Sequence, residues 1–122
     1  MIASVMMCVS AVLLLIGMLA GVVMGVQQDF TLAPAHAHLN LVGGVLLFMF
    51  GLYYRLVPAA GRLAMATVQG SLHIAGAVLF PVGIALVTLK GHSYVVAPIV
   101  GSLIVVVATA LFVTIVFRTS RS

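Results

Sequence analysis

The imidazoles of four histidines are the side chains of this sequence best suited to bind a metal or a cofactor. His36 and His38 stand two residues apart in "APAHAHLNLVGG", where a long apolar run begins. His73 lies inside another apolar run, and His92 lies in the short polar segment "KGHS". Ionisable side chains within a membrane helix commonly face a cavity or the protein interior and have a function. Two histidines in one turn, without an acidic partner, favour a role as ligands.

The two-residue spacing determines where this pair points. Successive residues of an α-helix turn by about 100°, so His36 and His38 face nearly opposite sides and serve separate sites. Asn40 follows on the His36 face, and nearby glycines are expected to leave room for something flat and large: Gly43, Gly44 and Gly51. An iron porphyrin requires such a site, with an axial nitrogen and room for the macrocycle. The sequence therefore predicts cofactor binding by His36, His38, Asn40, Gly43 and Gly44.

The composition places these histidines in a membrane. Of the 122 residues, 65% are hydrophobic and only 5% are charged, whereas about a quarter of a soluble domain is charged. Five basic residues and one acidic residue cannot cover a water-soluble surface. We therefore expect an all-α integral membrane protein surrounded by a lipid bilayer. Its net charge of +4 is explained by basic residues at helix ends and requires no nucleic-acid partner.

Four apolar segments are long enough to cross a bilayer, which takes about 20 helical residues. They span residues 2–26, 34–54, 63–89 and 94–117 within a single domain of residues 1–122. The short connections predict a bundle of antiparallel neighbours. The first segment lacks the basic start and the cleavage site of a signal peptide, so we expect it to be retained as a span.

Charges in the connections predict the orientation of the bundle. Lys90 alone falls at one end, and the arginines fall at the end that carries both termini: Arg55, Arg62, Arg118 and Arg121. We therefore expect a bacterial inner-membrane protein with both termini in the cytoplasm. His36 and His38 then lie near the outer surface.

The first segment carries three glycines four residues apart, at Gly17, Gly21 and Gly25. Small residues at this spacing let two helices approach closely in lipid. We expect this glycine face to pack against another helix, either within the protomer or in a neighbouring one.

The second segment, "AHAHLNLVGG…LYYRLVP", resembles the histidine-bearing helices of the catalytic subunit of heme-copper oxidases and nitric oxide reductases. In that family one helix carries His-x-His, and its two histidines ligate different hemes on opposite sides. The resemblance implies a four-helix fold like one of the family subunit's three pseudo-repeats. It also implies heme b as the cofactor, with His36 and His38 as ligands of heme iron.

Departures from the family leave three functions open. The family's oxidases bind copper through three further histidines, whereas the third segment here offers only His73, which lies deeper than His38. The chain is therefore an electron carrier or heme-linked sensor, an O2 or NO reductase with a second metal such as copper at His73, or a structural or assembly subunit. His73 is alternatively a buried polar contact near Gln69. His92 either meets heme propionates together with Lys90 or is a solvated loop residue.

The opposed directions of His36 and His38 also predict an oligomer, because one protomer cannot complete an axial pair. Heterologous contacts, in which one protomer's His38 faces its neighbour's His36, close into rings. The family's three pseudo-repeats imply a homotrimer with heme between protomers, and a dimer is the alternative. Two imidazoles would fill both axial positions, which favours electron transfer to or from a redox partner on the outer side.

Overall fold

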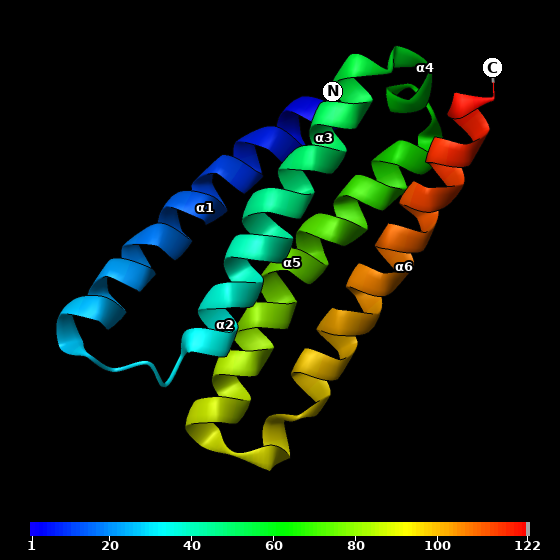
Figure 1. Cartoon of the computed structure of the whole chain (residues 1–122). Helices are drawn as coiled ribbons and strands as arrows, with labels where there is room; N and C mark the ends of the chain where they lie inside the picture. The colour runs from blue at the N-terminus through cyan, green and yellow to red at the C-terminus, as the bar shows by residue number, and fades with distance from the viewer. Residues whose placement is uncertain (122) are drawn as a thin grey trace.

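The computed structural model describes residues 1–121, which form an all-α bundle of four long helices (Figure 1). The elements are α1 (Ile2–Gln27), α2 (Ala33–His38), η1 (Leu39–Leu46), α3 (Leu47–Leu56), α4 (Pro58–Gly61), α5 (Ala64–Lys90), η2 (His92–Tyr94) and α6 (Val96–Ser120). Elements α2, η1 and α3 are continuous and make one span. Within residues 1–121, four helices are thus long and apolar enough to cross a membrane. This confirms the predicted all-α four-helix membrane fold.

The antiparallel course of the spans gives the bundle two distinct ends (Figure 1). The N-terminus, α4 and the last turns of α6 lie together at one end, which we call the arginine end because Arg55, Arg62 and Arg118 belong to it. The start of α2, with His36 and His38, lies at the opposite end together with the loop after α1 and the turn after α5. We call this second end the histidine end.

Both reversals of the chain at the histidine end use a residue in the left-handed region. Gln28 closes α1 with φ of 52°, and its side-chain Nε2 donates a hydrogen bond to the Gly25 carbonyl at 2.6 Å. Gly91 closes α5 with φ of 101°, a conformation that glycine adopts without steric cost. These tight ends bring α2 beside α1 and α6 beside α5.

The core lies towards the arginine end, and α1 diverges from α5 towards the histidine end. The buried core joins α1, α3, α4, α5 and α6, and consists of Ala3, Met6, Leu47, Phe50, Tyr54, Ala60, Ala66 and Ile115. Towards the histidine end α1 leans away from α5 (Figure 1). This divergence opens a groove between them, beside the start of α2.

The middle of the second span departs from α-helical geometry. Leu39–Leu46 form a π-helix, in which the N–H of Leu47 donates to the carbonyl of Val42, five residues back. Such i→i+5 segments are rare and are frequent at functional sites. The even 100° spacing expected along this span therefore applies within α2, which carries both histidines, and is wrong within η1 (Leu39–Leu46).

Candidate functional site

His36 faces α1, where two glycines accommodate it and its neighbour Asn40. A Cβ built on Gly21 would lie 2.9 Å from Cε1 of His36, and one built on Gly17 would overlap Oδ1 of Asn40. The glycine face of α1 thus packs within the protomer, against polar side chains of the second span. By contrast, a Cβ on Gly25 would meet nothing within 4 Å among the described atoms.

The imidazole of His36 is only partly satisfied in this position. Its Nε2 lies 3.4 Å from Nδ2 of Asn40, which is longer than the usual hydrogen-bond range. Nδ1 of His36 and Oδ1 of Asn40 are buried, and neither has a hydrogen-bond partner within residues 1–121. Buried polar atoms in proteins are usually paired, so this pair is a candidate binding element.

His38 faces a different helix and has a well-defined orientation. Its ring packs edge-on against Phe80 of α5, with ring centroids 4.7 Å apart. Its Nδ1 lies 2.7 Å from the carbonyl oxygen of Pro34. A carbonyl only accepts, so Nδ1 carries the hydrogen and Nε2 of the neutral ring keeps a free lone pair. The residue is partly exposed, and Nε2 is therefore the atom available to a ligand.

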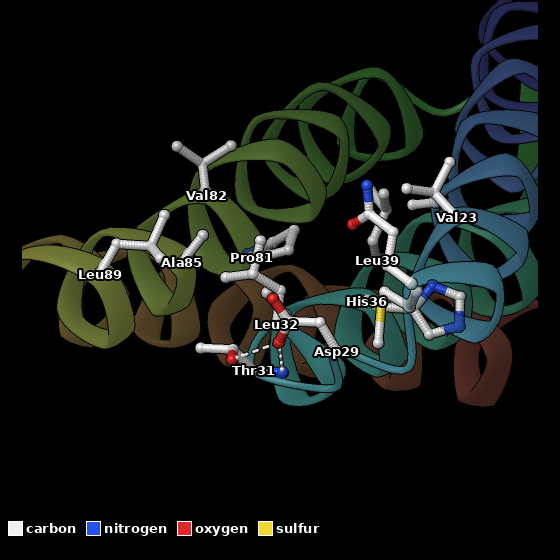
Figure 2. A pocket seen from close by; sticks show the side chains of 14 residues that line it. Val23, Asp29, Thr31, Leu32, His36, Leu39, Pro81, Val82, Ala85 and Leu89 are labelled. Carbon is white, nitrogen blue, oxygen red and sulfur yellow. Dashed lines mark hydrogen bonds between the residues drawn. The ribbon is translucent and has the colours of Figure 1, made fainter.

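A groove of about 540 Å³ opens at the histidine end between α1, α5 and the start of the second span. Figure 2 shows His36 and Leu39 on the side of the second span, Val23 on α1, and the α5 side chains opposite. Its polar lining is restricted to four residues: Gln27, Asp29, Thr31 and His36. The remainder is apolar: Ala20, Val23, Met24, Leu32, Ala35, Leu39, Pro81, Val82, Ala85 and Leu89.

The mouth of the groove carries the single acidic side chain of the sequence. Oδ1 of Asp29 accepts hydrogen bonds from the backbone N–H of Thr31 at 3.1 Å and from its hydroxyl at 2.5 Å (Figure 2). These hydrogen bonds lower the pKa of the Asp29 carboxyl below its ordinary value. The groove therefore combines an apolar body with an ionised carboxylate at its polar edge.

The prediction that the glycines of the second span leave open space beside them is wrong. A Cβ on Gly43 would lie 3.0 Å from Cδ1 of Leu13, and one on Gly44 would lie 2.8 Å from Cδ1 of Leu14. Gly51 packs on α1 in the same way. These glycines let α1 approach closely, and the available room lies instead in the groove beside His36.

His73 is fully buried on α5, one turn after the buried side chain of Gln69, and within residues 1–121 it is not part of a group of metal-ligating side chains. Its Nε2 donates to the Val42 carbonyl at 3.0 Å. One turn earlier on α5, Oε1 of Gln69 accepts a hydrogen bond from the hydroxyl of Tyr54 at 2.8 Å. Within residues 1–121 no three His, Cys, Asp or Glu side chains are grouped to hold a metal ion. His92 is exposed in η2.

The sequence did not single out Ser10, whose buried hydroxyl donates to the Gly44 carbonyl of the π-helix at 3.1 Å. Its only signal is that of an isolated polar residue within an apolar span. Its partner, a backbone carbonyl 34 residues away, has no signature in the sequence.

Comparisons of the chain with protein-family models, curated proteins and solved structures found no match. The resemblance of the second span to heme-copper oxidases and nitric oxide reductases therefore stays a prediction, resting on its own motif. A function must be argued from the site itself.

Proposed function

We propose that this membrane protein binds heme b and acts in electron transfer or heme-linked sensing, with His36 and His38 as the iron ligands. The hydrogen bond of His38 is the observation that carries the proposal. Donation from Nδ1 to the Pro34 carbonyl leaves Nε2 unprotonated on a partly exposed ring. Metal-ligating histidines almost always donate their other N–H in this way, which fixes the tautomer and the ring orientation.

His36 and the groove fit the second half of such a site. The groove wall is mostly apolar, as the faces of a porphyrin require, and His36 forms part of it. The long contact to Asn40 leaves Nε2 weakly engaged, and Nδ1 lacks a partner in the described chain. Lys90 follows the groove-lining Leu89 and offers a cation for heme propionates. When bound, heme supplies a one-electron redox couple whose potential its ligands tune.

A shared site follows from the directions of the two rings. His36 packs against α1 and His38 against α5, so one protomer does not present both to one iron. We infer a homotrimer in which the partly exposed His38 of each protomer meets the neighbouring groove that contains His36. Such heterologous contacts close into rings, and the number three follows the family resemblance. Two imidazoles leave no open iron position, which favours electron transfer over reduction of O2 or NO.

Copper is not part of the proposal, because within residues 1–121 no group of three His, Cys, Asp or Glu side chains could hold the ion together with His73. We propose a bacterial inner membrane as its location, with the termini in the cytoplasm; the cluster of arginines at the end with both termini supports this orientation. The histidine end then faces outward, where a redox partner would dock. Reporters fused to the C-terminus and inserted in the "KGHS" turn should indicate opposite sides, and an external C-terminus would contradict this orientation.

Titration of heme b into the purified protein in detergent tests the ligation. Optical and EPR spectra should show low-spin iron with sharp, split alpha bands. His36→Ala and His38→Ala should each abolish this species or convert it to high spin, whereas His92→Ala removes an exposed histidine at the same end and should change nothing. An unchanged spectrum in both variants would place the ligands elsewhere. A high-spin wild type that binds CO would favour a reductase, and no Soret band would favour a structural role.

Native mass spectrometry of the heme-loaded protein tests the shared site separately. A trimer with up to three hemes is expected. A monomer with a full heme complement would contradict ligation between protomers. A dimer would keep the ligation and remove the ring.

A further inference from the structure

The π-helix of the second span is bonded from both sides by buried side chains of other spans. Ser10 of α1 donates its hydroxyl hydrogen to the Gly44 carbonyl at 3.1 Å. His73 of α5 donates from Nε2 to the Val42 carbonyl at 3.0 Å. Ser10 is 1% exposed and His73 is 0% exposed, so neither donor has access to water.

Each of these hydrogen bonds stabilises the π-helix where its backbone is least regular. The Val42 carbonyl accepts from the N–H of Leu47 as well as from His73, so both of its lone pairs are used. In a bilayer, a donor that loses its carbonyl finds no water to replace it. The two side chains therefore favour the i→i+5 pattern over an ordinary α-helix at Leu39–Leu46.

We infer that Ser10 and His73 are positioning residues that set the direction of His36 and His38. The π-helix lies between α2, which carries both histidines, and α3, which is anchored in the core. Each residue taken up by an α-helix turns the preceding segment by about 100°. Relaxation of the π-helix by one residue would therefore turn both imidazoles away from α1 and α5. The change in backbone direction stands without heme; its effect on heme rests on the proposed function.

Lipid exposure of the second span reports this rotation directly. Leu41 and Val45 are 60% and 46% exposed, whereas Leu47 is 0% exposed. Single nitroxide labels at Leu41→Cys, Val45→Cys and Leu47→Cys would be introduced in a Cys8→Ser background, because Cys8 is a free and exposed thiol. EPR power saturation with O2 in lipid vesicles then measures how far each label faces the hydrocarbon.

The wild-type background should show high O2 accessibility at positions 41 and 45 and low accessibility at position 47. The double variant with Ser10→Ala and His73→Leu should lower the O2 accessibility of the label at position 41 or 45 to that of the label at position 47. His73→Gln keeps an N–H donor and should retain the original pattern. Ser102→Ala is the matched control, because the Ser102 hydroxyl bonds only within α6, to the Ile99 carbonyl. Unchanged accessibility at both positions in the double variant would overturn the inference.

Two further measurements keep the outcome decisive. If the double variant does not insert into the membrane, Ser10→Ala alone can be measured, because it removes only the hydroxyl oxygen. This single variant must still change the O2 accessibility at position 41 or 45. In heme-loaded protein, the same variants should shift the EPR g-values of the iron or convert it to high spin, and Ser102→Ala should do neither. Failure of every variant and the wild type to bind heme would refute the proposed function, whereas the nitroxide result would still decide the positioning role.

Discussion

Replacement of single glycines on α1 by alanine tests the packing that positions His36. A Cβ at Gly17 would overlap Oδ1 of Asn40 and would lie 2.8 Å from Cγ and 3.5 Å from Nδ2 of the same side chain. At Gly21 the new carbon would lie 2.9 Å from Cε1 and 3.2 Å from Nε2 of His36. Gly25 lies one further turn along the same face and has nothing described within 4 Å.

The expected change in the free energy of unfolding follows from the different contacts that an added Cβ would make at these three positions. Any glycine-to-alanine change inside a helix gains up to about 1 kcal/mol of helix propensity, and this gain is common to all three variants. Inserting a carbon into a filled contact costs about 1–3 kcal/mol. Gly17→Ala and Gly21→Ala should therefore be less stable than Gly25→Ala by about 1–3 kcal/mol, while Gly25→Ala is neutral or slightly stabilising.

Unfolding by SDS from mixed micelles, followed by far-ultraviolet circular dichroism, measures the free energy of unfolding of each variant. Equal stability of Gly17→Ala and Gly25→Ala would refute the placement of Asn40 against α1. Gly21→Ala carries a second consequence, because it moves the ring of His36 directly. Its heme spectrum should change under the proposed function, whereas that of Gly25→Ala should not.

Two further predictions concern the polar contacts at either end of the bundle. Gln69→Leu leaves the buried hydroxyl of Tyr54 without its acceptor, so the free energy of unfolding should fall by about 1–3 kcal/mol; if Tyr54→Phe in the same chain does not recover part of this loss, the hydrogen bond is not its cause. Thr31→Ala removes the hydroxyl donor, the main cause of the lowered Asp29 pKa, so a carbon-13 NMR titration should show that pKa rising towards its ordinary value. Because the folded pKa of Asp29 is lowered, the carboxylate stabilises the fold above its unfolded pKa and loses this effect as pH falls through the folded pKa. The loss of stability on acidification should be smaller in Thr31→Ala. An unchanged Asp29 pKa in this variant would contradict the role of Thr31.

The fold and the directions of the two histidines could be predicted because local rules govern both. Four long apolar runs, separated by arginines, glutamines and a lysine, leave no other arrangement for so few charges. The opposed directions of His36 and His38 depend only on the turn per residue within α2, and α2 is a regular helix from Ala33 to His38. No distant contact is needed for either inference.

The π-helix and the groove could not be predicted, because both depend on contacts between distant residues. The donors to the π-helix carbonyls lie 34 and 31 residues from their acceptors. Gly43 and Gly44 indicate a close approach, but only the structure shows that Leu13 and Leu14 fill it. The groove arises because the large core side chains gather at the arginine end and α1 diverges from α5 beyond them.

The directional contacts of this bundle are concentrated on one span, and this concentration has a physical reason. Apolar helices gain no hydrophobic energy by associating in lipid, so close packing at small residues and hydrogen bonds decide their positions. Gly17 and Gly21 receive Asn40 and His36, while Ser10 and His73 bond to the π-helix, so all these contacts act on the second span. On α6, by comparison, several hydroxyls bond within their own helix: Ser102, Thr109 and Thr114. The span that carries His36 and His38 is therefore the one whose rotation about its own axis is fixed by its neighbours, as the proposed site between protomers requires.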